Sequence, residues 1–335
     1  MKSHQLVYQI LARENDYVSG EKIGEELNLS RTSIWKAIQR LQQEGLEIDS
    51  IKNRGYKLIQ GDLILPDLIQ EKTNLIVHYK PETKSTQTDA KEGIEAGNKG
   101  NTLYLSTCQT AGRGRFQRPY YSPSQGGIYM SLHIQPNLHY EKLPSYTLLV
   151  AAAVYKAIKN LTMIEVDIKW VNDIYFKNKK IAGILTEAMT SVETGLVTDV
   201  IIGLGINFAI EDFPEDLKEK AGSLFMPPAP ITRNELISEI WRCFYQTAPE
   251  ELLYLYKEHS LVLGREVSFI QDQTKKKESP RTSPTKDNSL FSLMTRQKSG
   301  SIVVKSHSLA GLNKQHYMMS RISSSKHIVL FECRK

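Results

Sequence analysis

The 335 residues, 40% hydrophobic and 24% charged, have the composition of an ordinary soluble protein and are enough for two or three domains. No apolar run approaches a membrane span, no secretory signal opens the chain, and the scattered cysteines Cys108, Cys243 and Cys333 predict neither disulfides nor a metal site, so we expect a cytoplasmic protein. Residues 273–335 hold 13 Lys+Arg and 3 Asp+Glu, whereas residues 1–272 carry a net charge of −4, so the total of +6 supports no nucleic-acid argument for the rest.

The first sixty residues predict three helices followed by a hairpin. Apolar residues recur at helical spacing in 4–13, 20–27 and 31–44, and Ser19 and Ser30 suit the N-caps of the second and third helices. Residues 47–50 and 51–58 alternate like strands around Asn53-Arg54-Gly55. This order predicts a winged helix-turn-helix DNA-binding domain over residues 1–62, with 31–44 as the recognition helix.

One face of the third helix carries side chains that suit phosphates and base edges. They are Arg31, Thr32, Ser33, Trp35, Lys36 and Arg40. A small module for protein contacts is the alternative, because residues 1–60 hold 9 Lys+Arg against 8 Asp+Glu, a weak charge for DNA binding. We favour DNA binding, and we expect a dimer on two half-sites because one nearly neutral module would bind weakly.

Residues 66–260 alternate between strand-like and helix-like segments, after a linker that begins at Gln60. Residues 127–134 alternate strictly, residues 146–160 indicate an alanine-rich helix, and three further segments indicate strands: 164–170, 180–189 and 198–207. The order predicts an α+β domain with a mixed or largely antiparallel sheet. Because no GxxxxGK[ST] segment occurs, an ATP site in this domain would not be a P-loop.

The loop 106–116 carries the clearest signal for ligand binding. Gly112 and Gly114 free its backbone to approach a ligand closely. Arg113 and Arg115 add two guanidinium groups that suit a phosphate chain or a carboxylate. An RNA-binding Arg/Gly loop or a solvated turn is the alternative, which the lack of further Arg-Gly repeats disfavours.

Three other segments carry weaker signals. Residues 84–87 (Lys-Ser-Thr-Gln) follow a strand and suit a small polar ligand, although a simple helix cap would use the same residues. Residues 169–173 (Lys-Trp-Val-Asn-Asp) and 180–187 place amide, carboxylate and lysine groups on one hairpin, where a solvated turn is the alternative. Residues 203–207 (Gly-Leu-Gly-Ile-Asn) end an apolar strand, where glycines often mark close packing only, so Asn207 is the more informative residue.

Together and in this order, these segments resemble the motifs of the biotin protein ligase family. The family's paired-arginine loop corresponds to 112–115, its Ser-Thr-Asn to 85–87, its Lys-Trp-Pro-Asn-Asp to 169–173, its Lys-x-Ala-Gly-Ile-Leu-x-Glu to 180–187 and its Gly-x-Gly-Ile-Asn to 203–207. The departures are Gln87, Phe116-Gln117, Tyr120 in place of an expected tryptophan, and Val171 in place of proline; none removes a charged group. The resemblance covers residues 1–270, and lipoate ligases, which share the catalytic fold, lack this motif set.

The resemblance implies an enzyme that uses ATP, biotin and Mg²⁺ to form biotinyl-5'-AMP and transfers biotin to a lysine of a biotin carboxyl carrier protein. The residues implied to bind biotin or its adenylate are Ser85, Thr86, Gln87, Gln109, Arg113, Gly114, Arg115 and Lys180. Asn172 and Asn207 would contact the nucleotide and metal region. Arg113, Arg115 and Lys180 would stabilise the charge that develops as the carboxylate attacks the α-phosphate, and Asp173 would deprotonate the acceptor lysine.

The resemblance also implies a second partner, operator DNA, with the adenylate favouring a homodimer and repression. The C-terminal region does not follow the family, however. Residues 263–270 predict the first strand of a small barrel, whereas 273–335 are rich in Lys and Ser and show no second strand.

Over residues 261–335 we therefore expect a small barrel that is truncated or frameshifted. One explanation is that a disordered basic extension follows the first strand, and the other is a reading-frame shift near residues 273–277. Codons that encode residues 276–310 can be chosen so that the shifted reading frame encodes a sequence with the alternation of β-strands. Two alternatives to an active enzyme stay open. One is a non-catalytic biotin-sensing repressor, and the other is an inactive product of a frameshifted gene.

Overall fold

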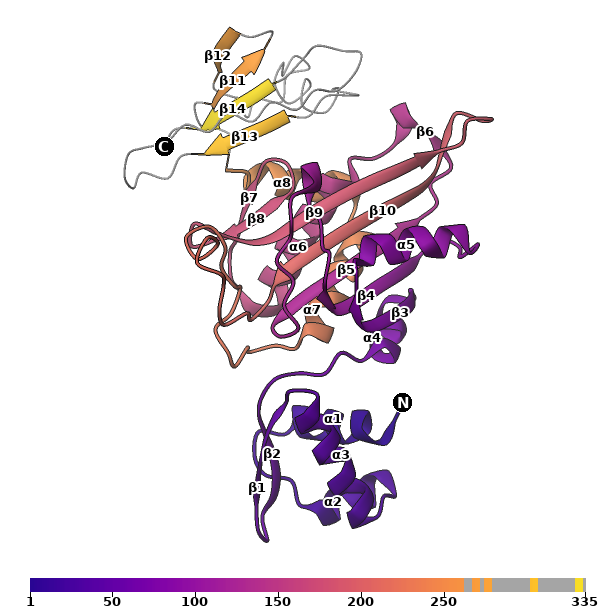
Figure 1. The fold of residues 1–335 in the computed structure, drawn as a ribbon, viewed down its shortest axis with the longest axis vertical. Coiled ribbons are helices and arrows are strands. Elements are labelled where there is room, and N and C mark those ends of the chain that lie inside the picture. Colours follow the sequence, from indigo (N-terminus) through magenta and orange to yellow (C-terminus); the bar gives the residue numbers. More distant parts are fainter. Residues whose placement is uncertain (262–266, 272–273, 279–301, 307–328, 334–335) are drawn as a thin grey trace.

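The computed structural model describes residues 1–261, 267–271, 274–278, 302–306 and 329–333, which form an N-terminal head, a central domain and a C-terminal sheet (Figure 1). The head contains α1 (Ser3–Arg13), α2 (Gly20–Leu27), α3 (Arg31–Gln43), β1 (Glu47–Ile51) and β2 (Gly55–Gln60). The predicted three helices and hairpin are confirmed. The turn, however, falls at residues 52–54, so Ile51 ends the first strand instead of beginning the second.

Two capping serines fix the starts of α2 and α3, and one glycine lets the wing approach the helices closely. The Ser19 and Ser30 hydroxyls accept hydrogen bonds from backbone N–H groups at the starts of α2 and α3, as predicted. Gly55 has a φ of +111°, and a Cβ there would lie 2.0 Å from the Val18 carbonyl oxygen. A side chain at this position would therefore break the bridge between Val18 and Tyr56 that joins the wing to the helices.

The central domain is built on a mixed sheet with the order β3-β4-β5-β10-β9-β8-β7. Its strands are β3 (Ile76–Thr83), β4 (Thr102–Gln109), β5 (Gly127–Ile134), β7 (Asp167–Lys169), β8 (Asp173–Phe176), β9 (Lys179–Thr190) and β10 (Leu196–Asn207), with the short β6 (Leu138–His139) paired to β10. Only β3 and β4 pair in parallel; the other pairs described in this sheet are antiparallel. The prediction of an α+β domain with a mixed sheet is confirmed.

Helices cover both faces of this sheet. The helices are α4 (Pro66–Thr73), α5 (Thr86–Glu95), α6 (Tyr146–Thr162), α7 (Arg233–Gln246) and α8 (Pro249–Glu258). The largely buried α6 packs with the alternate strand residues Leu103, Leu105 and Ile202 in the main core. Ala90 of α5 packs on the opposite face against Tyr104 and Ile201. The alternation of side chains along a strand thus separates a thick apolar layer from the α5 face.

A short linker joins the head to the central domain through buried polar contacts. Arg233, at the start of α7, pairs with Asp62 at 2.5 Å and also donates to the Gly127 carbonyl at 3.2 Å. Asn234 donates to the Leu63 carbonyl and accepts from the Leu65 amide. Leu63, Leu65 and Leu68 pack against the apolar core of the head. The head therefore packs against the central domain at this junction.

The C-terminal sheet has the order β12-β11-β14-β13. Its strands are β11 (Val267–Gln271), β12 (Thr274–Glu278), β13 (Ile302–Ser306) and β14 (Val329–Cys333). The last three lie where the sequence predicts no strand, because a ladder of backbone hydrogen bonds does not require alternating side chains. Residues 279–301 and 307–328, where most of the expected extension or frame shift falls, lie outside the described residues. Among the helices that the structure describes, none is long and apolar enough to span a membrane.

Candidate functional site

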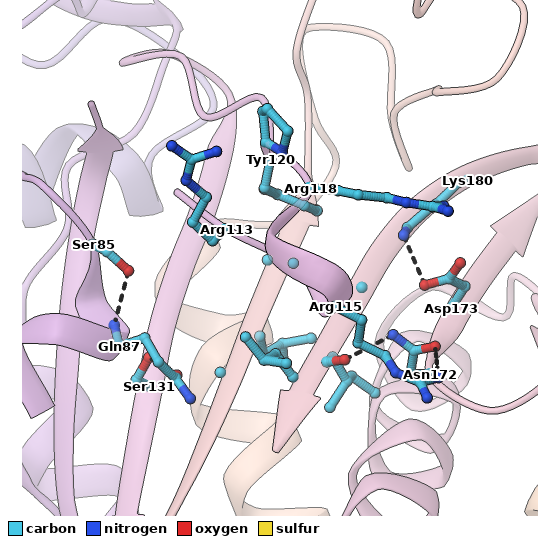
Figure 2. A pocket seen from close by; sticks show the side chains of 18 of the residues that line it. Ser85, Gln87, Arg113, Arg115, Arg118, Tyr120, Ser131, Asn172, Asp173 and Lys180 are labelled. Atoms are coloured by element: carbon cyan, nitrogen blue, oxygen red, sulfur yellow. Dashed lines mark hydrogen bonds and ion pairs between the residues drawn. The ribbon is translucent and has the colours of Figure 1, made fainter. Parts of the chain in front are cut away.

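A pocket of about 380 Å³ lies on the α5 face of the central sheet (Figure 2). Three glycines contribute to its floor: Gly183 of β9 pairs with Gly205 of β10 in the register, and Gly203 lies two residues before Gly205. A Cβ on Gly203 would lie 2.5 Å from the Gln87 Oε1, and a Cβ on Gly205 would lie 2.5 Å from the Tyr120 ring. The two glycines of the Gly-x-Gly segment therefore admit side chains that line the pocket.

The start of α5 forms an uncharged, hydrogen-bonding side of the pocket. The Thr86 amide donates to Gln109 Oε1 at 2.9 Å, and the Thr86 and Ser131 hydroxyls are 2.9 Å apart. Ser131 donates to Gln87 Oε1 at 2.9 Å, and Gln87 Nε2 donates to Glu187 at 2.8 Å. Because Thr86, Gln87 and Ser131 are buried and these groups already orient one another, they can recognise a neutral polar ligand with little reorganisation.

Cationic groups occupy the other side. Arg115 donates to the Asn172 side-chain oxygen at 3.3 Å, and the Asn172 amide in turn donates to the Ile184 carbonyl at 2.9 Å. The Ile184 amide donates back to the Asn172 carbonyl at 2.8 Å. Burial lowers the pKa of Arg115 from its ordinary value, and the nearby Asp173 carboxylate opposes that shift. Arg115 is thus held at a defined place on the wall of the pocket.

Lys180 and Asp173 form an ion pair of 2.7 Å between β9 and β8 (Figure 2). The backbone of Lys180 is fixed by hydrogen bonds with Lys220 and Gly222. Asn207 lies behind it: its side chain is 5% exposed and donates to the carbonyls of Gly222, at 2.9 Å, and Lys180, at 3.4 Å. The backbone of Lys180 is therefore fixed on both sides, and its side-chain amine extends from it to Asp173.

The structure brings most of the predicted residues together. Those lining the pocket are Ser85, Thr86, Gln87, Gln109, Arg113, Gly114, Arg115, Asn172, Asp173 and Lys180. Asn207 is not among them and supports the Lys180 backbone instead. Arg113 is exposed and donates to the Gln117 carbonyl, whereas Arg115 is half-buried.

Sequence reasoning did not select several residues that line the pocket. Phe116 and Gln117 both have φ near +58°, and the resulting turn brings Arg118 back, so that Arg115 and Arg118 lie 5.4 and 5.9 Å from the Phe116 ring. A third arginine three residues after the second was the available signal. Ser131 is on the pocket face of the alternating strand β5, and its position follows from the pairing of Ser131 with Gly203, which the sequence does not reveal.

The third helix of the head separates an apolar face from a polar one. Ile34, Ala37, Ile38 and Leu41 are buried, while Trp35 is 55% exposed. Arg31, Thr32 and Lys36 are also exposed. Two predicted residues have partners within the helix region, because the Ser33 hydroxyl bonds the Ser30 hydroxyl and Arg40 pairs with Glu44 at 2.7 Å.

The fold and the site define a class of protein in which a winged helix-turn-helix head is joined to a mixed-sheet, ligand-binding domain. Residues 79–207 match the family model of the biotin/lipoate A/B protein ligase family, and residues 2–57 match a model for an HTH domain. The bifunctional ligase/repressor BirA of Bacillus subtilis is 39% identical over 239 residues, which cover 69% of this chain and 73% of that protein. The chain belongs to the family of bifunctional biotin ligase/repressor proteins.

Other comparisons agree with that assignment. The BirA protein of Escherichia coli is 28% identical over 221 residues, which cover 65% of this chain and 68% of that protein. The structure of the biotin protein ligase from Aquifex aeolicus in complex with biotin and ATP is 26% identical, with a TM-score of 0.50, and the match covers 61% of this chain and 86% of that one.

Proposed function

We propose that this chain is an ATP-dependent biotin protein ligase that also represses transcription at operator DNA. The single observation that carries the ligase function is the division of one pocket into a neutral hydrogen-bonding side, around Thr86, Gln109 and Ser131, and a cationic side, around Arg115, Arg118 and Lys180. Such a pocket suits a ligand with a neutral polar head and a carboxylate that must meet a phosphate chain.

Biotin has this character. Its ureido ring would be held by the side chains at the start of α5 and by Gln109, and its aliphatic chain would follow the glycine floor toward the cationic side. There the carboxylate would meet Lys180 and the arginines. Burial of the neutral head on oriented donors and acceptors would give specificity, because an analogue lacking those groups would leave the pocket's polar atoms without partners.

In the first half-reaction the biotin carboxylate attacks the α-phosphate of ATP and pyrophosphate leaves. Arg113, Arg115, Arg118 and Lys180 would offset the repulsion between the two anions and stabilise the charge of the transition state. Asn172 and Asn207 would lie in the nucleotide region. In the structure Asn172 accepts from Arg115, and Asn207 donates to the Lys180 carbonyl.

Mg²⁺ fits the site as an ion carried by the nucleotide. Among the described residues no group of three His, Cys, Asp or Glu side chains lies close enough to hold a metal ion, and Asp173 is the carboxylate of the pocket lining. Mg²⁺ commonly binds through one or two carboxylates, water and substrate phosphates. When bound, it would neutralise phosphate charge, held mainly by the nucleotide phosphates and water beside Asn172.

In the second half-reaction a lysine of a biotin carboxyl carrier protein attacks the adenylate. An unperturbed lysine has a pKa of about 10.4, so a base must take its proton near neutral pH. Asp173 is the proposed base. In the described structure Lys180 neutralises it at 2.7 Å. An adenylate phosphate would attract Lys180 and leave the Asp173 carboxylate available.

The repressor function is assigned to the head, with the exposed Arg31, Thr32, Trp35 and Lys36 of α3 facing the major groove. Ser33 and Arg40 would complete this face. We propose that a homodimer binds two operator half-sites, that the protein acts in the cytoplasm, and that 1–62, 66–260 and 261–335 are its functional units. The last would be a small C-terminal barrel that is truncated or frameshifted.

Biotin-dependent exchange of labelled pyrophosphate into ATP tests the ligase proposal, since it reports biotinyl-5'-AMP formation without a carrier protein. We expect exchange that requires biotin and Mg²⁺ and is lost in Lys180→Ala. Retention of full exchange in Lys180→Ala would refute the assigned site. A folded chain that is stabilised by biotin but shows no exchange would instead identify a non-catalytic biotin-sensing repressor.

A further inference from the structure

We propose that Tyr256 of α8 is a positioning residue for adenylate formation, acting through the turn Trp170–Asp173. The inference rests on the proposed ligase function for the effect of Tyr256 on kcat. Its effect on the order of the turn does not depend on that function. Tyr256 lies outside every segment in which the sequence showed a ligand-binding signal, and it does not line the pocket.

Tyr256 contacts two residues of the turn directly. Its side chain is 1% exposed, and its hydroxyl donates to the Val171 carbonyl at 3.3 Å. Its ring meets the Trp170 ring edge to face, with centroids 6.3 Å apart and planes at 79°. Burial, and secondarily the nearby Asp173 charge, raise the pKa of Tyr256, so its hydroxyl stays protonated and remains a donor.

The opposite side of the turn is held by β9. Asn172 exchanges two hydrogen bonds with Ile184, through its backbone carbonyl and its side-chain amide. The turn is therefore fixed between Ile184 and Tyr256. Position 171 is a valine, so no proline ring restricts the backbone there, and its order depends more on these contacts.

Helix α8 is itself firmly placed, which makes it a suitable support. Leu252 and Tyr256 are buried in the main core. Directly after the helix, the His259 carbonyl accepts from the Ile168 amide at 2.8 Å and the Leu261 amide donates to the Ile168 carbonyl at 2.9 Å. These bonds tie the end of α8 to β7, the strand that leads into the turn.

The turn carries two groups that contact the cationic side, and it carries none of the groups named for the neutral side. Asn172 orients Arg115, and Asp173 pairs with Lys180. The neutral side is carried by α5, β4 and β5. Loosening the turn should therefore impair the step at the phosphate while leaving the recognition of the biotin head unchanged.

The test compares Tyr256→Phe with Tyr155→Phe in the full-length chain. Tyr155 of α6 is a matched control: it is 2% exposed, its hydroxyl bonds Lys159 at 3.3 Å, and it lies outside the pocket lining. In pyrophosphate exchange we expect kcat to fall about fivefold in Tyr256→Phe, the factor that corresponds to one typical hydrogen bond, with KM for biotin within about twofold. Tyr155→Phe should leave both within about twofold.

Hydrogen exchange measured on peptides covering 168–185 gives a readout that needs no turnover. The Ile184 amide, which donates to Asn172, should exchange faster in Tyr256→Phe and not in Tyr155→Phe. In the Asn172→Ala background, Tyr256→Phe should lower kcat by much less than fivefold, because both act through one turn.

Equal hydrogen exchange at 168–185 in the two tyrosine variants would overturn the proposal. So would an equal fall in kcat in Tyr155→Phe. A rise in KM for biotin as large as the fall in kcat in Tyr256→Phe would also overturn it. An inactive wild-type chain with faster exchange only in Tyr256→Phe would support the positioning role. The same result would refute the ligase function, so the two failures are distinguishable.

Discussion

Asp173 lies at the centre of the pocket's charges, paired with Lys180 and close enough to Arg115 to oppose the effect of burial on its pKa. Its proposed role as the base belongs to the transfer step alone. In Asp173→Asn we expect transfer from preformed biotinyl-5'-AMP to the carrier lysine to slow by roughly 10²–10⁴-fold, the usual contribution of a general base. Single-turnover transfer, measured beside pyrophosphate exchange, checks this.

Adenylate formation should change far less in that variant, because Arg115 and the lysine remain. Equal losses in the two half-reactions would show that Asp173 serves the site as a whole, for example by holding Lys180 or the metal, and would remove its assignment as the base.

At the residue scale, the sequence predicted most of the pocket because its motif residues come from a few short segments. The paired arginines and Gln109 belong to one strand and loop, and all of them line the pocket. The sequence could not predict that Asn207 supports Lys180, because that role depends on a contact with residue 222. Nor could it predict that two residues of positive φ return Arg118 to the site.

At the element scale, a buried polar pair lies between β5 and β10. His133 is fully buried and shares a 2.8 Å hydrogen bond with Asp199. Burial of Asp199 raises the pKa of its carboxyl, but hydrogen bonds from His133, Thr198 and Gln135 outweigh burial, so the pKa lies below its ordinary value. Ionised Asp199 therefore stabilises the sheet beneath α5.

Since the folded-state pKa of Asp199 is depressed, its contribution to stability is present above the unfolded pKa of about 3.9 and is lost as the pH falls through the folded value. Asp199→Asn should lower the free energy of unfolding by about 1–3 kcal/mol at neutral pH. The difference from wild type should shrink below about pH 4. Denaturant titrations at both pH values test this, and a difference independent of pH would exclude the linkage.

Long elements with clear periodicity were predictable. Residues 127–134 form β5 as predicted, and the helix expected at 146–160 extends to Thr162. The strand expected at 164–170 shrinks to β7. The hairpin expected across 169–187 is formed by β8 and β9, and β8 begins at Asp173 after a sharp turn. The parallel pairing of β3 with β4 and the order of the sheet depend on contacts distant in sequence, which no local pattern specifies.

At the scale of the whole molecule, the junction around Asp62 and Arg233 joins the head to the central domain. Both side chains are nearly buried, at 13% and 9% exposed. Removing one partner leaves the other charge buried, so Arg233→Ala should destabilise the chain by about 3–5 kcal/mol. Thermal unfolding and proteolysis at residues 60–66 check this, because the linker should become accessible.

Gln60→Ala is the control, since it removes only an exposed hydrogen bond to Glu211 at 2.9 Å between the same two domains. We expect it to change stability by less than about 0.5 kcal/mol. If Arg233→Ala were no more destabilising than this control, the junction would not be the connection that fixes the head.

As a biotin ligase, the chain with its unusual residues 273–335 should transfer biotin to protein. The intact mass of a purified apo biotin carrier domain, taken after incubation with the chain, ATP, Mg²⁺ and biotin, tests it most directly. We predict a gain in mass of one biotin unit that requires ATP and disappears with Arg115→Ala, whose side chain lies on the cationic wall of the pocket. An unchanged carrier mass with a folded full-length chain would contradict the ligase function.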